Sequence, residues 1–181
     1  MSSELVASLG PNDFIRESSL GNDTSVQVIN PYGTAGDLRG ISLPKLTNPN
    51  IAVKGYIASF RIPANITMGT GLTFKIYLSD DGVFAADLGL KVEVGVTVKR
   101  LAADETTDID MAAGTEQLVA VTLSSTAGGV AIGSLAIASA NLDSAAVGDL
   151  VMIRVRRKGT DTTNDTAQGR AILWRIEVQN T

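Results

Sequence analysis

Paired carboxylates are the side chains in this sequence that could carry out acid–base chemistry. Such pairs occur at three places: the adjacent residues Asp80 and Asp81, the adjacent residues Asp104 and Glu105, and Asp108 with Asp110 two positions later. A glycosidase needs two carboxylates that face each other across a cleft. All three pairs fall in turn-like or acidic loop segments, where such residues serve turn geometry and solubility. We therefore predict that the protein is not an enzyme. A carboxylate-based hydrolase is the alternative, and buried, facing acids in a cleft would support it.

Histidine and cysteine are both absent from the chain. A Ser-His-Asp triad and any site built on thiolate or imidazole ligands are therefore excluded within one chain. Oxygen donors occur at 108–110 and 161–165, but neither segment has the glycine and distal glutamate of a calcium loop. The glycine pairs at 69–71 and 128–129 lack the Lys-Ser/Thr of a phosphate-binding loop. We predict no catalytic residue, no metal and no cofactor.

The charge pattern argues against a nucleic-acid partner. Lys and Arg number 15 against 19 Asp and Glu, for a net charge of −4. The one basic concentration, 154–158, is followed by Asp161 and Asp165, which indicates a solvated strand edge. No apolar run approaches the ~20 residues of a membrane span. Residues 1–4 lack a secretory start, so we expect synthesis in the cytoplasm.

Strands must position whatever site the chain has. From Leu90 to Lys99 apolar and polar residues alternate at every step, which is the pattern of a half-buried β-strand. Similar patterns occur at 24–29, 41–43, 51–62, 72–78, 115–123, 130–137, 150–157 and 171–178. This predicts an all-β protein, a two-sheet antiparallel sandwich of about eight strands. The wide spacing of roughly 15 to 20 residues between strand centres favours a jelly-roll or Greek-key topology.

The alternation also predicts which side chains fill the core. In the last strand Ile172, Trp174, Ile176 and Val178 fall on one side, so we expect the single tryptophan to pack between the two sheets. A platform on which a sugar stacks is the alternative for Trp174.

The first 23 residues are predicted to form an extended arm, and residues 24–181 a single sandwich domain. Residues 2–9 could make a turn or two of helix, ended by Gly10-Pro11. Spaced apolar residues in a polar background indicate a segment that cannot fold alone and is either mobile or ordered against a partner. The candidate partner-binding residues are Leu5, Leu9, Phe14, Ile15 and Leu20. Deletion of the arm is expected to leave the fold intact and to abolish partner binding.

The last third of the chain resembles a group of small virion proteins of tailed bacteriophages. The resemblance rests on the run 146–157 (AVGDLVMIRVRR), the polar loop that follows it, and the closing run 169–178 (GRAILWRIEV). Residues 62–63 and 72–78 (LTFKIYL) are also similar, so that the likeness spans roughly residues 50–180. It implies a viral jelly roll that coats a capsid as a cement or decoration protein, or that forms a head fibre.

Two functions follow as expectations. The first is a structural protein on the capsid exterior of the virion, which binds the major capsid protein through its arm and sheet edges, as a homo-oligomer (dimer or trimer). The second is a carbohydrate-binding or host-adsorption module. It needs exposed aromatic residues beside polar loops, and Tyr32, Tyr77 and Phe84 are the candidates. No nucleic-acid or membrane partner is expected.

Overall fold

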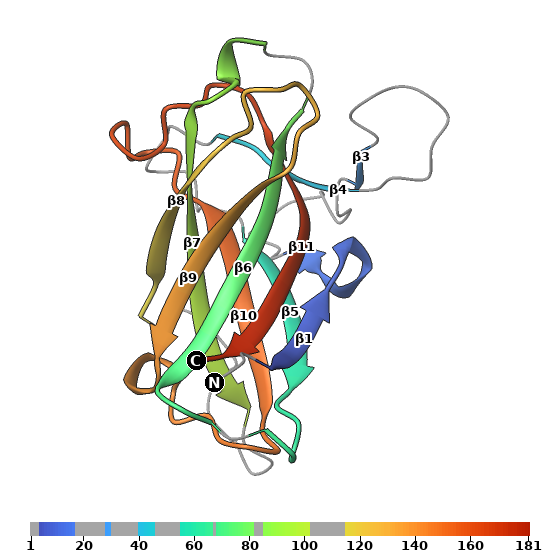
Figure 1. Ribbon diagram of the computed structural model, residues 1–181, viewed down its shortest axis with the longest axis vertical. Helices are drawn as coiled ribbons and strands as arrows, with labels where there is room; N and C mark the ends of the chain where they lie inside the picture. Colours follow the sequence, from blue (N-terminus) through green and yellow to red (C-terminus); the bar gives the residue numbers. More distant parts are fainter. Residues whose placement is uncertain are drawn as a thin grey trace.

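The protein is a β-sandwich of two antiparallel sheets, seen in a computed structural model (Figure 1). The structure describes residues 4–16, 28–29, 40–45, 55–66, 68–81, 85–101 and 115–181. We call the two layers the front sheet and the back sheet, as Figure 1 shows them. The front sheet has the order β3-β4-β11-β6-β9, with β1 also paired to β11. Its strands are β1 (Leu5–Leu9), β3 (Val28–Ile29), β4 (Gly40–Leu43), β6 (Gly71–Asp80), β9 (Ala131–Ala138) and β11 (Ala171–Asn180).

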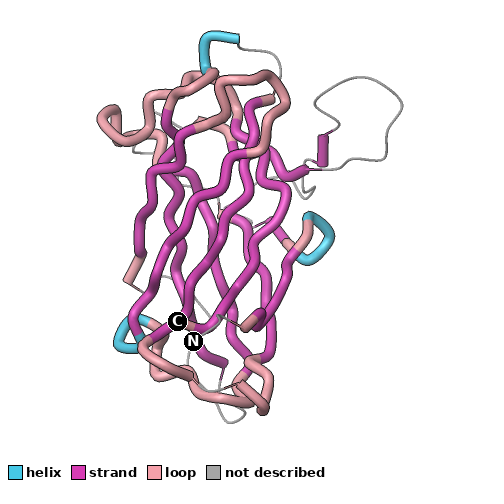
Figure 2. The backbone as a smooth tube through the Cα atoms, in the orientation of Figure 1, coloured by secondary structure: helices cyan, strands magenta, loops and turns pink. Residues whose placement is uncertain are grey.

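The back sheet has the order β2-β5-β10-β7-β8. Its strands are β2 (Ile15–Arg16), β5 (Tyr56–Arg61), β7 (Lys91–Leu101), β8 (Gln117–Thr122) and β10 (Leu150–Arg157). Short 3-10 turns lie outside the strands: η1 (Pro11–Asp13), η2 (Ala85–Asp87) and η4 (Ser139–Asn141). Figure 2 shows most of the loops gathered at the two ends of the sandwich.

The strand order confirms the predicted jelly roll. From β4 onward, the four strands β4-β11-β6-β9 face the four strands β5-β10-β7-β8. Consecutive strands cross between the sheets at every step except from β7 to β8. Eight strands wound in this way form a jelly roll. The expected all-β, two-sheet architecture is therefore correct.

The core lies between the sheets and is filled by the alternate residues that the sequence predicted. In β6 the inward residues Leu72, Phe74, Ile76 and Leu78 are all fully buried, and in β7 so are Val92, Val94 and Val96. Apolar side chains from two facing sheets exclude water from one continuous core, which is the main stabilising contribution of this fold. The single-domain prediction for 24–181 begins among residues that the structure does not describe.

The last strand departs from simple alternation at one residue. The register of β11 against β6 shifts between Leu173 and Arg175, which pair with the consecutive residues Leu78 and Tyr77. Trp174 is the extra residue of a β-bulge, and a bulge reverses the faces of the residues that follow it. The core therefore receives Ala171, Leu173, Ile176 and Val178. The expectation that Trp174 packs between the sheets is wrong, because the bulge places it on the outer face.

The N-terminal segment also differs from its prediction. Residues 5–9 form strand β1 and pair with β11, from Leu5 opposite Gln179 to Leu9 opposite Ile176. The buried residues Val6 and Leu9 are three apart, which is a helix-like spacing. A register shift between Leu5 and Ala7 produces that spacing in a strand. The predicted helical turn is wrong, and residues 17–23 of the predicted arm lie outside the described residues.

Candidate functional site

The outer face of the front sheet carries a tryptophan beside the first strand of the jelly roll. The indole Nε1–H of Trp174 donates a hydrogen bond of 2.9 Å to Oγ of Ser79. Its side chain is half-buried, and its Cε3 lies 3.4 Å from the place a Cβ on Gly40 would take. That Cβ would also overlap Ile172, so only glycine at position 40 lets β4 approach this close. The edge of the ring is therefore fixed, and part of its surface stays in solvent.

A tyrosine, an arginine and a glutamate continue along the same face. The guanidinium carbon of Arg175 lies 4.6 Å from the ring centroid of Tyr77, in cation–π contact. The hydroxyl of Tyr77 donates a hydrogen bond of 2.7 Å to Oε2 of Glu177. Arg175 Nη2 lies 3.1 Å from Oε1 of the same carboxylate. We call Trp174, Tyr77, Arg175 and Glu177 the outer aromatic strip.

The electrostatics of the strip keep its groups in fixed ionic states. The hydrogen bond to Glu177, together with burial and the charge of that carboxylate, raises the pKa of Tyr77. The phenol therefore stays protonated and donates. Arg175 is about half exposed, at 47 %, whereas Glu177 is 18 % exposed. The strip thus offers a flat apolar surface next to a planar donor and a carboxylate acceptor.

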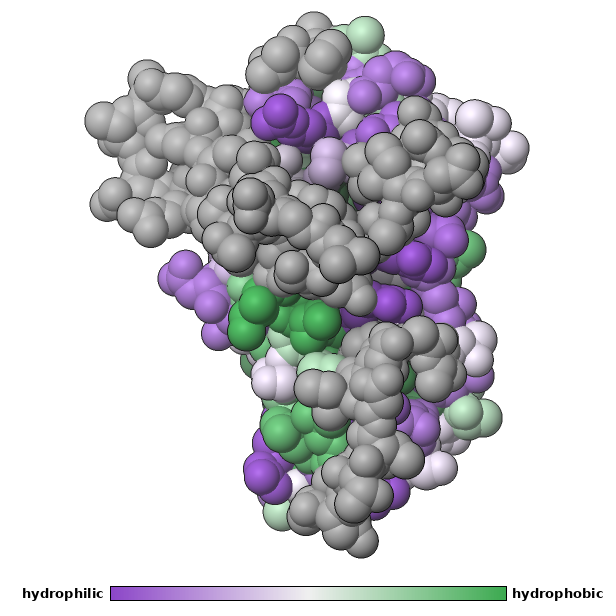
Figure 3. Space-filling view, turned by 180° about the vertical axis from the view of Figure 1, so that it is seen from behind, coloured by the Kyte–Doolittle hydropathy of each residue, from purple (hydrophilic) through white to green (hydrophobic). Residues whose placement is uncertain are grey.

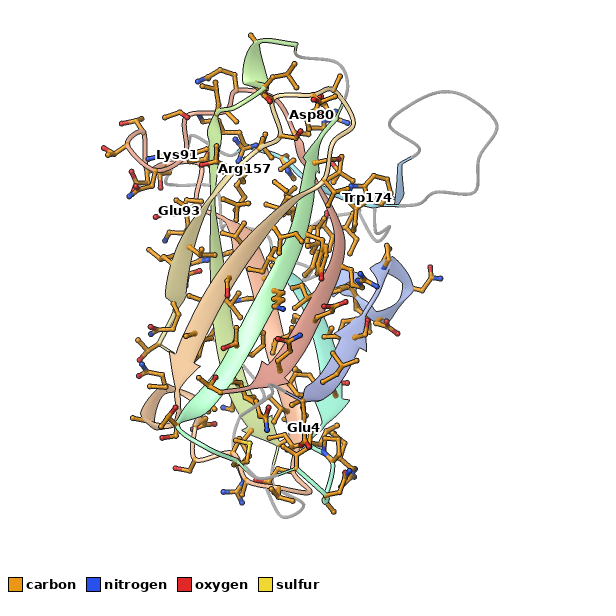
Figure 4. All side chains as sticks on the ribbon, in the orientation of Figure 1. Glu4, Asp80, Lys91, Glu93, Arg157 and Trp174 are labelled. Atoms are coloured by element: carbon orange, nitrogen blue, oxygen red, sulfur yellow. The ribbon has the colours of Figure 1, made fainter. Side chains whose placement is uncertain are left out.

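A second polar assembly lies at the start of β11, in the loop from β10 to β11. Arg157, at the end of β10, is buried and donates two hydrogen bonds to the buried carboxylate of Asp165, at 2.7 and 2.5 Å. It also donates to the carbonyl oxygens of Ala167 and Gly169, at 2.6 and 2.5 Å. The interpretation of 154–158 as a solvated edge is wrong at Arg157, which ties this loop to the core. Figure 4 shows Arg157 at this end, near Glu93 and Lys91.

Asp87 holds the other side of this loop. Its buried carboxylate accepts hydrogen bonds from the backbone N–H of Gln168 and Gly169, at 2.8 and 2.5 Å. The ammonium of Lys45 donates to the carbonyl oxygen of Asp165 at 3.1 Å. Every charged group of this assembly is thus used to fix the loop.

An open polar pocket of about 360 Å³ lies against this loop. It is lined by Lys45, Gly159, Thr160, Thr162, Asp165, Thr166 and Gln168. Asp165 is the one carboxylate in that lining, and Arg157 already neutralises it. A general acid and a general base cannot both come from one ion-paired carboxylate. The described lining therefore lacks the facing acid pair that a carboxylate hydrolase requires.

Two further carboxyl groups meet near this loop without entering the pocket lining. Burial, followed by the charge of Asp161, raises the pKa of Glu93, whose Oε2 has no hydrogen-bond partner. Backbone hydrogen bonds from Asn164 and Thr163 lower the pKa of Asp161. Asp161 thereby closes a turn in the loop, as aspartates commonly do.

The outer face of the back sheet is charged. Arg156 on β10 forms an ion pair and hydrogen bonds with Glu116, which also lies 3.1 Å from Lys158 Nζ. These two cations lower the pKa of Glu116, although burial opposes them. Figure 3 shows this side of the molecule from behind, where hydrophilic residues cover much of the described surface beside two hydrophobic patches.

Four of the five predicted arm residues are described, and the structure separates these four instead of bringing them together. Leu9 and Phe14 are 5 % and 3 % exposed and belong to the core of this same chain. Leu5 and Ile15 are exposed, at 55 % and 73 %, but they lie on different sheets. Leu20 lies outside the described residues. Leu9 and Phe14 are therefore corrected from partner-binding to core positions.

The predicted acidic and aromatic candidates are divided in the same way. Asp80 and Asp81 are buried at the end of β6, where Asp80 accepts the N–H of Gly128 at 3.1 Å. Tyr77 lies on the outer aromatic strip. The remaining candidates lie outside the described residues: Tyr32, Phe84, Asp104, Glu105, Asp108 and Asp110.

In the described part of the chain, the Asp and Glu side chains form no group of three that could hold a metal ion. None of its helices has the length and apolar character needed to cross a membrane.

Neither a protein-family model nor a curated protein matches the chain. Among solved structures it is similar to the CBM22-1–GH10 modules of Clostridium thermocellum endo-1,4-β-D-xylanase 10B, complexed with xylohexaose. That match has 12 % identity and a TM-score of 0.48, and covers 98 % of this chain and 28 % of the other. It is also similar to a xylan-binding module, CBM15, with 10 % identity, a TM-score of 0.41 and 97 % of each chain covered. Similarity at this level does not transfer a ligand or an activity to this chain.

Proposed function

We propose that this protein is a non-catalytic carbohydrate-binding module, which holds a glycan on the outer aromatic strip of the front sheet. The observation that carries the proposal is the β-bulge at Trp174, which turns the only tryptophan outward beside Tyr77, Arg175 and Glu177. A strand that served only to fill the core would not need a bulge that changes which of its residues face outward.

The strip has both kinds of contact that a sugar needs. One face of a pyranose ring is apolar and packs on an aromatic ring, whereas its hydroxyl groups need donors and acceptors at the edge. Trp174 supplies the apolar surface. Arg175 Nη2 and Glu177 Oε1, 3.1 Å apart, supply a donor and an acceptor that two neighbouring hydroxyl groups can bridge.

The experiment is titration calorimetry with a panel of neutral and acidic oligosaccharides that includes xylohexaose, after a glycan array has selected the panel. The variant Arg175→Ala is expected to weaken binding about tenfold, which corresponds to the loss of roughly one charged hydrogen bond. Arg154→Ala is the matched control, because Arg154 lies on β10 of the other sheet. Absence of binding to every glycan, or equal losses in both variants, would overturn the proposal.

A second candidate is a structural protein on the exterior of a tailed-phage capsid, bound to the major capsid protein. It is favoured by the resemblance of 146–157 and 169–178 to such proteins. The first run forms β10 together with the turn at 146–149 that precedes it, and the second forms most of β11. In that turn Asp149 accepts the N–H of Ala146 at 2.8 Å, and Gly148 has a φ of +88°. Co-sedimentation with phage heads from the source of the chain tests it, and protein that stays in the supernatant would exclude it.

A further inference from the structure

One long stretch of this chain carries no charge. From Gln117 to Leu142 there is no Asp, Glu, Lys or Arg, although charged residues make up 19 % of the sequence. At that average, a stretch of this length would hold about five of them. The neutral stretch ends on both sides at an acid, Glu116 and Asp143.

The fold places this stretch along one side of the sandwich. It contains β8, at one end of the back sheet, and β9, at one end of the front sheet. The two strands lie close together at this side, because a Cβ on Gly133 of β9 would overlap the side chain of Val121 on β8. Figure 1 shows β8 and β9 next to each other along the left side of the molecule.

The β8–β9 side also lacks the usual protection of a free sheet edge. Natural proteins guard such edges with charges, proline, bulges or very short strands. β9 pairs with β6 in unbroken register over eight residues, and β8 pairs with β7 in unbroken register over six. At the other side of the front sheet, β1 has an irregular register, which is one of these protections.

The exposed side chains of the β8–β9 side are apolar or small. Leu118, Val130 and Ile132 are 45 %, 51 % and 57 % exposed, which is half of the large exposed hydrophobic side chains in the described chain. The other outward positions of β9 are Ser134, Ala136 and Ala138, all exposed. Among the described strands β9 pairs with β6 alone, so its other edge offers backbone groups with which a further strand can pair.

We propose that β9 pairs with β9 of a second copy of this chain, antiparallel about a two-fold axis, so that two front sheets join into one. Such an axis pairs residue i of one strand with residue j of the other, and residue j with residue i. A charge on this short strand would therefore occur twice across the junction, which is destabilising where the like charges lie opposite or close to each other, and a neutral strand has no such cost. Each chain has a net charge of −4, so two copies repel each other elsewhere and approach most easily along a neutral side. A partner protein selected by charge complementarity would have nothing to recognise on this edge.

The experiment is multi-angle light scattering of the full chain, at concentrations from about 1 to 100 μM. The wild-type protein is expected to have twice the mass of one chain. Ile132→Lys places a like charge on the joining strand of both copies and replaces an exposed apolar side chain, and is expected to give the mass of a single chain. Ile15→Lys is the matched control, because it makes the same replacement at an exposed isoleucine on β2 and is expected to stay dimeric.

Circular dichroism and thermal unfolding check that both variants remain folded. If Ile132→Lys does not fold, Ser134→Lys, at another exposed outward position of β9, takes its place. A wild-type mass of one chain at the highest concentration, a mass of three chains, or equal dissociation of the Ile132 and Ile15 variants would each overturn the proposal.

Discussion

The guanidinium of Arg157 holds the carboxylate of Asp165 through two parallel hydrogen bonds of 2.7 and 2.5 Å, and both side chains are cut off from solvent. Two more donors of the same arginine satisfy carbonyl oxygens of the loop that leads into β11. The run of basic residues at the end of β10 therefore includes a residue that organises the fold. At this position, the end of β10 and the loop behind it close the jelly roll.

Replacement of Arg157 is expected to destabilise the protein strongly. Arg157→Met leaves the buried Asp165 carboxylate without its main partner, which typically costs about 3–5 kcal/mol. Urea unfolding measures the loss. Arg154→Met is the control. Arg154 lies three residues earlier on β10 and is half-buried, so its replacement is expected to cost about 1 kcal/mol or less. The double variant Arg157→Met, Asp165→Leu is expected to recover part of the loss, because it removes the buried carboxylate that Arg157→Met leaves without its guanidinium. Lys45 Nζ, 3.9 Å from Oδ1 of Asp165, loses that ion pair but keeps its hydrogen bond to the carbonyl oxygen of residue 165. Equal costs for the two arginine variants would contradict the role of the pair.

The N-terminal segment is expected to stabilise the domain to which it belongs. Phe14→Ala removes a side chain that is 3 % exposed, and such a change typically costs about 3–5 kcal/mol. Its sequence neighbour Ile15 is 73 % exposed, so Ile15→Ala is expected to change stability by about 0.5 kcal/mol or less. Thermal or urea unfolding of the two variants compares them directly. A Phe14 variant as stable as the wild type would restore the interpretation of this segment as an arm reserved for a partner.

Glu93 is expected to make stability depend on pH. Burial and Asp161 raise its pKa in the folded state, so the folded protein binds the proton more tightly than the unfolded chain does. The contribution of Glu93 to the free energy of unfolding is therefore fully present below the ordinary pKa of a glutamate. It is lost as the pH rises through the raised pKa of Glu93 in the folded protein. Glu93→Gln mimics the protonated form and removes the unpartnered carboxylate oxygen, so it is expected to stabilise the protein at pH 7 by on the order of 1 kcal/mol.

The measurement is urea unfolding of wild type and Glu93→Gln at several pH values. The two proteins are expected to converge in acid, where the wild-type carboxyl group is protonated. Glu4→Gln, at an exposed position, is the control and should follow the wild type at every pH. A Glu93 variant that is no more stable than the wild type at neutral pH would show that the carboxylate is accommodated without cost.

The strands were predictable because period-two alternation is a local property of the chain. Leu150–Arg157 was predicted with the bounds that the structure has, and the inward residues from Leu72 to Leu78 are all buried. Strands such as β5, β9 and β10 have one more exposed and one buried face, so their pattern can be recognised without knowledge of the neighbouring strands. The jelly-roll order followed from long connections, which cross between sheets more easily than they form hairpins.

The bulges were not predictable in the same way, and the candidate site depends on one of them. A bulge is a mismatch between two strands, so the pattern of one strand does not reveal it. In β11 it moved Trp174 from the expected core to the outer face, and in β1 it produced an apolar spacing that looked helical. Arg157 was misread for a related reason. Its buried partner lies eight residues away, in a loop whose course the charge pattern does not specify.

The position of Trp174 gives the protein an intrinsic optical probe. All tryptophan emission comes from one indole, which is anchored at 2.9 Å to Ser79 and otherwise partly open to water on the front sheet. A molecule that settles over the ring excludes that water and shifts the emission to shorter wavelength. Contacts made along the β8–β9 side or on the back sheet leave the fluorescence unchanged. Unlabelled protein can therefore report which of its surfaces has been occupied.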